Sequence, residues 1–156
     1  MRKLAESKGM YFFLQLLALV CLADAWYAAG AEMLRNAAVM LACGILALAV
    51  GLVCLIRTAR TPYPEECANA LNLVFHGLAA AFLLRAAIVS FGLYHIFLPD
   101  AAGIMNMLRY DVDDGLVFIV ISFSFAASLI GLVACILLVC MGLTARREAA
   151  MVSNCD

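Results

Sequence analysis

Long apolar stretches separated by short polar segments dominate the sequence. The apolar stretches cover residues 10–30, 37–56, 69–97 and 116–143. Each is long enough to cross a bilayer as a helix, which takes about 20 residues. Backbone polar groups in lipid must be hydrogen-bonded within the protein, and a helix achieves this in one segment. The pattern therefore predicts an all-α, polytopic integral membrane protein, with four transmembrane helices in an antiparallel bundle that forms a single membrane domain over residues 1–156.

Composition supports the same interpretation. The chain is 67% hydrophobic and only 13% charged, with a mean hydropathy of +1.06. A soluble domain is roughly 45–50% apolar, so this chain needs lipid around it. The expected partners are the lipid bilayer and either other membrane subunits or further copies of the same chain, with no nucleic acid.

The first apolar stretch has the outline of a signal peptide. A basic lead precedes it, and Ala23-Asp24-Ala25 resembles a cleavage site. Its apolar run is longer than the roughly 7–15 residues of a signal peptide core. We therefore expect residues 10–30 to be retained as a membrane span.

Three polar segments join the spans, the first of them the very short 31–36, and a tail follows the last span. Residues 57–68 are predicted to be a cytoplasmic loop, in which Pro64, followed by Glu65 and Glu66, suits the first turn of the third helix. Residues 98–115 are predicted to be an outer loop with a short helix in the membrane interface. The tail, 144–156, contains nothing that would hold it in one conformation.

Basic residues are unevenly distributed between the two sides of the predicted membrane. Four spans place both termini on one side, which then carries Arg2, Lys3, Lys8, Arg57, Arg60, Arg146 and Arg147. The other side carries only Arg35 and Arg109. Lysine and arginine accumulate in cytoplasmic loops, so the distribution predicts that the N and C termini are cytoplasmic. The most fitting location is the bacterial cytoplasmic (inner) membrane.

Two opposite charges fall at similar depths in the predicted helices. Asp24 lies roughly 21 Å along the first span and Arg85 roughly 24 Å along the third, at 1.5 Å per residue. A charge in the membrane core is costly without a partner. We predict that Asp24 and Arg85 form an ion pair. One alternative is that Arg85 reaches outward to the interface or faces a water-filled crevice, while Asp24 reaches the interface. Another is that Arg85 pairs with a carboxylate of another protein.

Other polar side chains occupy the spans and the outer loop. His76, Ser122, Ser124 and Ser128 are candidates for polar contacts between helices. The predicted interaction site of the outer loop consists of Arg109, Asp111, Asp113 and Asp114. A calcium loop does not fit these acids, because Ser122 stands where such a loop needs glutamate. His76 and His95 lie on one helix, so they cannot hold a haem between them within one chain.

Small residues recur four positions apart in two of the spans. These pairs are Ala38 and Ala42, Ala47 and Gly51, and Ala127 and Gly131. Such spacing lets helix backbones approach closely in lipid, so these residues are predicted to pack helices together. No heptad repeat is visible.

No catalytic pattern is present. The seven cysteines contain no CxxC pair and no spacing typical of zinc ligands. We expect no enzyme activity, no cofactor and no metal. The sequence favours a non-catalytic integral subunit of a larger inner-membrane assembly of the secretion, transfer or respiratory type, acting through helix packing and an acidic outer loop. The alternative is a homo-oligomeric small transporter, or an ion or proton channel, that uses Asp24 and Arg85.

Overall fold

The computed structural model describes residues 8–32, 37–61, 65, 67–97 and 112–153, with side chains described for 8–26, 42–61, 65, 67–91, 119–120 and 122–151. Within these ranges the chain forms helices and no strand. The helices are α2 (Lys8–Glu32), α3 (Ala37–Arg60), α4 (Ala70–Phe97) and α6 (Val112–Ser153). Each contains a segment long and apolar enough to cross a membrane. The prediction of an all-helical protein with four such helices is confirmed.

Helix α3 continues beyond the predicted span. It ends at Arg60, and the N–H of Thr61 still donates to the carbonyl of Arg57 at 2.8 Å. Neither glycine nor proline interrupts this turn, and its arginines face the negative end of the helix dipole. The loop predicted to start at residue 57 therefore starts one turn later.

Helix α4 begins at Ala70 rather than near Pro64. The side chain of Asn69 accepts a hydrogen bond from the N–H of Leu71 at 2.9 Å, and its carbonyl accepts one from Leu73 at 3.2 Å. Asparagine is among the strongest residues at this capping position. Glu65 instead lies in a turn. The prediction that the third helix starts at the proline and the two glutamates is therefore wrong.

Helix α6 is longer than predicted at both ends. It includes Asp113 and Asp114, which were assigned to the outer loop, and it continues through most of the predicted tail to Ser153. The tail residues up to Ser153 contain no glycine or proline and are mostly good helix formers. Ala145 is buried and so holds the extension against the rest of the protein. The expectation of a tail without fixed conformation is wrong for residues 144–153.

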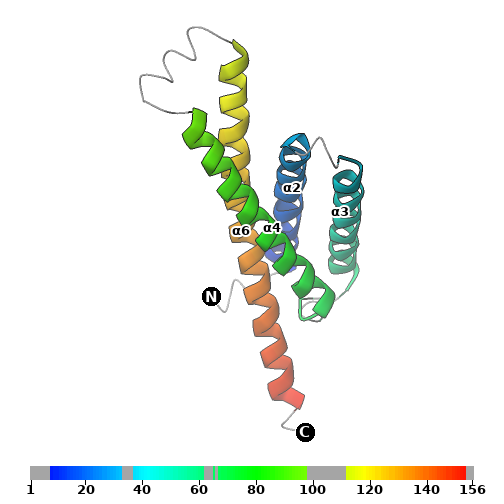
Figure 1. Cartoon of the computed structure of the whole chain (residues 1–156). Coiled ribbons are helices and arrows are strands. Elements are labelled where there is room, and N and C mark those ends of the chain that lie inside the picture. Colours follow the sequence, from blue (N-terminus) through cyan, green and yellow to red (C-terminus); the bar gives the residue numbers. More distant parts are fainter. Residues whose placement is uncertain (1–7, 33–36, 62–64, 66, 98–111, 154–156) are drawn as a thin grey trace.

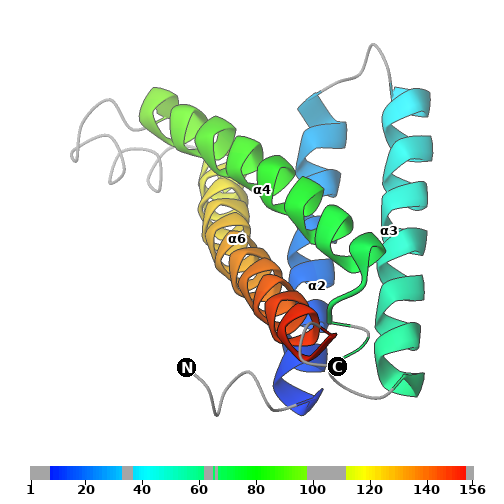
Figure 2. The ribbon, with the colours of Figure 1, turned by 90° about the horizontal axis from the view of Figure 1, so that it is seen from below.

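Helix α6 is the centre of the arrangement. It lies against α4 and α2, while α3 packs chiefly on α2 (Figure 1). Neighbouring helices of each pair, α2 with α3 and α4 with α6, run in opposite chain directions (Figure 2). In both views α4 runs diagonally across α2 and α3, so the four axes are not all aligned. Lys8 joins the start of α2 to the end of α3 by donating to the carbonyl of Ala59 at 3.0 Å.

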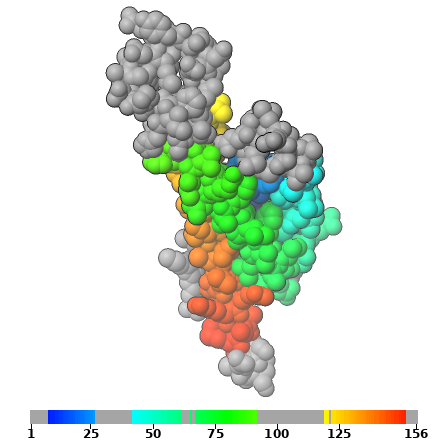
Figure 3. Space-filling view, in the orientation of Figure 1, coloured from blue at the N-terminus to red at the C-terminus, as the bar shows by residue number. Residues whose placement is uncertain are grey.

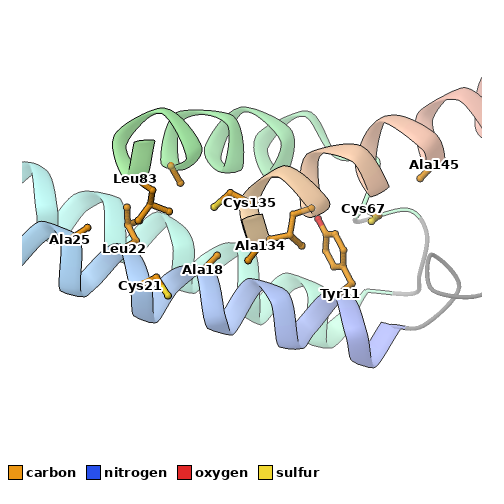
Figure 4. Packing of buried hydrophobic residues seen from close by; sticks show 12 residues of the cluster. Tyr11, Ala18, Cys21, Leu22, Ala25, Cys67, Leu83, Ala134, Cys135 and Ala145 are labelled. Atoms are coloured by element: carbon orange, nitrogen blue, oxygen red, sulfur yellow. The ribbon is translucent and has the colours of Figure 1, made fainter. Parts of the chain in front are cut away.

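Most buried positions of α2, α4 and α6 form one stripe along each helix, with steps of three or four residues. On α6 the stripe consists of Ser124, Ser128, Gly131, Cys135, Leu138, Gly142 and Ala145. On α2 it consists of Tyr11, Gln15, Ala18, Leu22 and Ala25, and on α4 of Asn72, His76, Ala79, Leu83, Ala87 and Ser90. Figure 4 shows side chains of these stripes converging on one interior.

The stripes do not stand out in the sequence because most of their residues are small or polar, and Tyr11, Leu22, Leu83 and Leu138 are the large ones. The large apolar side chains instead cover the outside, where Leu78 of α4 is 68% exposed and Leu46 of α3 is 66% exposed. Figure 3 shows the side chains of α4 beside those of α3 on one such face. Lipid tails are as apolar as leucine, so hydrophobicity alone does not select which face of a membrane helix turns inward.

Candidate functional site

Arg85 lies on the outside of the helical assembly, near the middle of α4. Its side chain is exposed, whereas Leu83 and Ala87 on either side of it are buried. At 1.5 Å per residue, Arg85 is roughly 22 Å from Ala70 and roughly 18 Å from Phe97 along the helix. It falls inside the apolar segment Ala70–Phe91. The arginine therefore projects from a face otherwise suited to lipid.

Asp24 lies on α2 and points partly inward. Its side chain is half-buried, and its Oδ2 atom is buried without a hydrogen-bond partner. Asp24 and Arg85 are both among the described residues, and no ion pair joins them there. The structure does not bring the two charges together, and their pairing stays a prediction.

His76 is buried on the inner stripe of α4. Its Nδ1 lies 2.6 Å from the backbone carbonyl of Asn72, one turn earlier. A carbonyl oxygen only accepts hydrogen bonds, so the Nδ1–H of His76 must be the donor. The histidine thus bonds its own helix, and this contact orients its ring toward the interior of the protein.

The three predicted serines of α6 differ in their surroundings. Ser124 and Ser128 are buried on the stripe of α6, whereas Ser122 is only half-buried. The Oγ atom of Ser128 has no hydrogen-bond partner in the described part of the chain. Only two of the three serines therefore face the helix contacts for which they were proposed.

Gln15 of α2 was missed by the sequence reasoning. Its side chain is 3% exposed, and neither its amide nitrogen nor its amide oxygen has a hydrogen-bond partner among the described residues. A signal was present, because Gln15 and Asp24 interrupt an apolar span, and Gln15 lies four residues after Tyr11 and seven before Leu22. An uncharged amide in such a span is a stronger candidate for the interior than for the lipid face.

The small residues predicted to pack helices together differ in how deeply they are buried. Gly51 and Gly131 are buried, Ala47 and Ala127 are half-buried, and Ala42 is exposed. The side chain of Ala38 lies outside the described ones. A methyl group at Gly131 would lie 2.5 Å from Cys21 Cβ, and one at Gly51 would lie 2.5 Å from Leu19 Cδ1. Both glycines therefore sit where two helices approach closely.

The outer-loop residues are only partly covered by the structure. Arg109 and Asp111 lie outside the described residues. Asp113 and Asp114 fall in the first turn of α6, where the positive end of the helix dipole favours acids. Within the described ranges, no group of three His, Cys, Asp or Glu side chains could hold a metal ion. The six cysteines described there are free thiols.

An apolar groove of about 380 Å³ lies between α3 and α4, with α2 at its base. We call it the α3–α4 groove. Its walls include Leu46, Ala47 and Val50 of α3, Val74, Leu78 and Phe82 of α4, and Leu22 and Trp26 of α2. The ring of Trp26 stacks on Phe82 with centroids 4.7 Å apart, and it also lies against Gly44. The groove exists because α4 crosses α3 at an angle and contacts it only in part.

The geometry combines an apolar groove, an exposed arginine and buried polar side chains, all within membrane-type helices. Comparison of the chain with protein-family models, with curated proteins and with solved structures finds no match.

Proposed function

We propose that the protein is a non-catalytic integral membrane subunit of a larger multi-protein assembly. The observation that carries this proposal is the exposed position of Arg85 within an apolar membrane helix. A charged side chain in the membrane core costs at least about 2.5 kcal/mol unless it finds a partner or water. The described part of the chain supplies no ion-pair partner, and a neighbouring protein with a carboxylate at the same depth would supply one.

The proposed orientation has both termini in the cytoplasm, with the four spans forming an antiparallel bundle. The hydrogen bond from Lys8 to Ala59 supports it, because it joins the start of α2 to the end of α3 at one end of the molecule. Arg57 and Arg60 lie at the same end of α3. Basic residues at one end fit the cytoplasmic side of a bacterial inner membrane.

The assembly belongs to a secretion, transfer or respiratory type, with the acidic outer loop as a second contact region. The protein would act by holding neighbouring membrane subunits in place. The exposed large apolar side chains of α3 and α4 offer a broad surface for such packing.

The test is the mass and composition of the complex extracted from its native membrane into nanodiscs. The expected result is unrelated proteins at fixed stoichiometry with this chain, and loss of these proteins in the Arg85→Gln variant. Arg60→Gln is the matched control, because Arg60 is an exposed arginine at a helix end rather than mid-helix. A pure homo-oligomer would overturn the proposal.

A second function is favoured by a different observation. Buried side-chain atoms of Gln15, Asp24 and Ser128 lack hydrogen-bond partners among the described residues. Polar groups inside a membrane bundle often mark an ion or proton path. A homo-oligomeric transporter or channel would then conduct protons or ions in liposomes, and Asp24→Asn would abolish the flux. Liposomes that stay impermeable with the wild-type chain would exclude this function.

A further inference from the structure

We infer that the α3–α4 groove is the docking site of one transmembrane helix from a different protein, and that a carboxylate of that helix pairs with Arg85. This inference rests on the proposed function, because it names the surface and the kind of partner by which the subunit joins its assembly.

The outer stripe of α4 links the groove to the arginine. The stripe consists of Val74, Leu78, Ala81, Arg85 and Ile88, which recur every three or four residues and are all exposed. Val74 and Leu78 form the α4 wall of the groove. A helix running along this stripe would touch the groove with one half and Arg85 with the other.

The groove has the shape that a helix with protruding side chains needs. Its rim is formed by large exposed residues, Leu46 on α3 and Leu78 on α4. Between the rims lie Ala47 and Ala79, which are small. Helices pack by inserting side-chain ridges into grooves, and a small residue at the contact allows close approach in lipid. The groove therefore fits a ridge of apolar side chains.

The position of Arg85 along α4 favours a protein carboxylate over a lipid phosphate as its partner. Arg85 is roughly 18 Å from one end of α4 and roughly 22 Å from the other, whereas lipid phosphates lie outside the hydrocarbon core. A carboxylate on a transmembrane helix reaches the same depth directly. The guanidinium also binds carboxylates through two parallel hydrogen bonds, which fixes the position of the partner helix.

A second copy of this chain is a poor source of the carboxylate. Asp24 is the described acid in the interior of the candidate spans, and its Oδ2 atom is buried in its own protein. Glu148 lies within the last turns of α6, beyond Arg146 and Arg147. The carboxylate that meets Arg85 is therefore expected from a different polypeptide.

The experiment places a photo-crosslinking amino acid at Leu78 in the full chain, expressed in its native membrane. Ile130 of α6 is the matched control, because it is also a large, exposed, apolar residue at a second apolar hollow, between α2 and α6. The expected result is an adduct from Leu78 with one membrane protein that carries an acidic residue in a span. Ile130 should give at least about tenfold less of this adduct, as should Leu78 combined with Arg85→Gln.

Charge exchange completes the test. Arg85→Asp should abolish the adduct, and it should return when the acid of the partner helix is replaced by arginine. Arg85→Lys should retain part of it, because lysine keeps the charge but loses the paired hydrogen bonds. Each variant must show the wild-type helical content by circular dichroism in detergent.

Four results would overturn the inference. Adducts of this chain with itself would place a second copy in the groove, and adducts with lipid alone would place an acyl chain there. Adducts that form equally from Ile130, or that survive Arg85→Gln, would remove the role of the groove and the arginine. In that last case unrelated proteins still accompany the wild-type chain, so the proposed function stands. The proposed function itself would fail if no unrelated proteins accompanied the wild-type chain.

Discussion

Helices α6 and α3 are both strongly apolar, but they differ in how closely they pack against the other helices. Both contain apolar segments suited to a membrane. Helix α6 lies against both α2 and α4: a methyl group at its Gly131 would lie 2.5 Å from Cys21 Cβ of α2 and 3.1 Å from Leu83 Cδ1 of α4. Helix α3 packs chiefly on α2 and borders the α3–α4 groove on its other side.

The difference shows what organises a membrane protein of this kind. Apolar side chains gain little by moving from lipid into the protein, so their number does not decide which helix becomes central. Small residues at heptad spacing decide which helix becomes central, because they allow two helix backbones to approach closely. Helix α6 carries a stripe of small residues in which only Leu138 is large, while α3 has buried glycines at positions 44 and 51 and leaves much of its surface open.

The largest effect is expected from truncating a side chain that packs on α6. Leu83 is fully buried, and its Cδ1 lies 3.1 Å from the place where Gly131 would carry a methyl group. Leu83→Ala should lower the free energy of unfolding by about 3 kcal/mol, because it leaves a cavity among three helices. Unfolding by sodium dodecyl sulfate in mixed micelles measures the change.

The matched variant on α3 is Leu46→Ala, at a side chain that is 66% exposed. It should change the free energy of unfolding by less than about 0.5 kcal/mol, because lipid replaces the lost contacts. Equal losses for the two variants would contradict the distinction between a central α6 and a peripheral α3.

The second comparison makes the same substitution in both helices. Gly142→Ala should cost about 2 kcal/mol, because the new methyl group meets a backbone oxygen, that of Cys67, and the backbone must shift. Gly51→Ala should cost at most about 1 kcal/mol, because it meets the movable ends of Leu19 and Phe75. The same micelle unfolding assay ranks the two, and a larger loss at Gly51 would reverse the proposed order.

The sequence was sufficient for the four helices but not for their packing. Length and apolar content identified every span, because only a helix satisfies its backbone in lipid within one segment. The ends of the helices were harder to predict than the helices themselves. Asn69, and not Pro64, marks the start of α4, because a side chain that caps the free N–H groups determines the start more directly than a proline does. Which face of a helix turns inward depends on the size of its side chains, and a hydropathy pattern does not record side-chain size.

The candidate site shows the same limit. Arg85 stood out in the sequence because a charge in an apolar segment is conspicuous. The exposure of its side chain was not predictable from the sequence, because it depends on the rotation of α4 about its own axis against α6. Gln15 was overlooked because an uncharged amide barely alters hydropathy, although its burial is nearly complete. The α3–α4 groove arises from the angle between two helices, which no local sequence feature specifies.

A smaller effect is expected at Gln15, on the face of α2 directed toward the interior. Gln15→Leu should raise the free energy of unfolding by about 1 kcal/mol, because it removes a buried amide without partners and keeps a similar volume. The measurement is again unfolding in mixed micelles, with Leu16→Gln on the exposed face of the same helix as the reverse change. A loss of stability in Gln15→Leu would mean that the amide is hydrogen-bonded to bound water in the membrane.

The smallest effect is expected at Gly77, a glycine of α4 that faces away from the helix contacts. A methyl group there would have no neighbouring atom within 4 Å, in contrast to Gly51, Gly131 and Gly142. Gly77→Ala should therefore raise the free energy of unfolding by about 0.5 kcal/mol, through the greater helix propensity of alanine alone. Because the same substitution is expected to destabilise at Gly142, the opposite signs would establish that close approach, and not glycine itself, distinguishes the interior stripe. A loss at Gly77 comparable to that at Gly142 would contradict this account, because it would occur where the added methyl group meets no neighbouring atom.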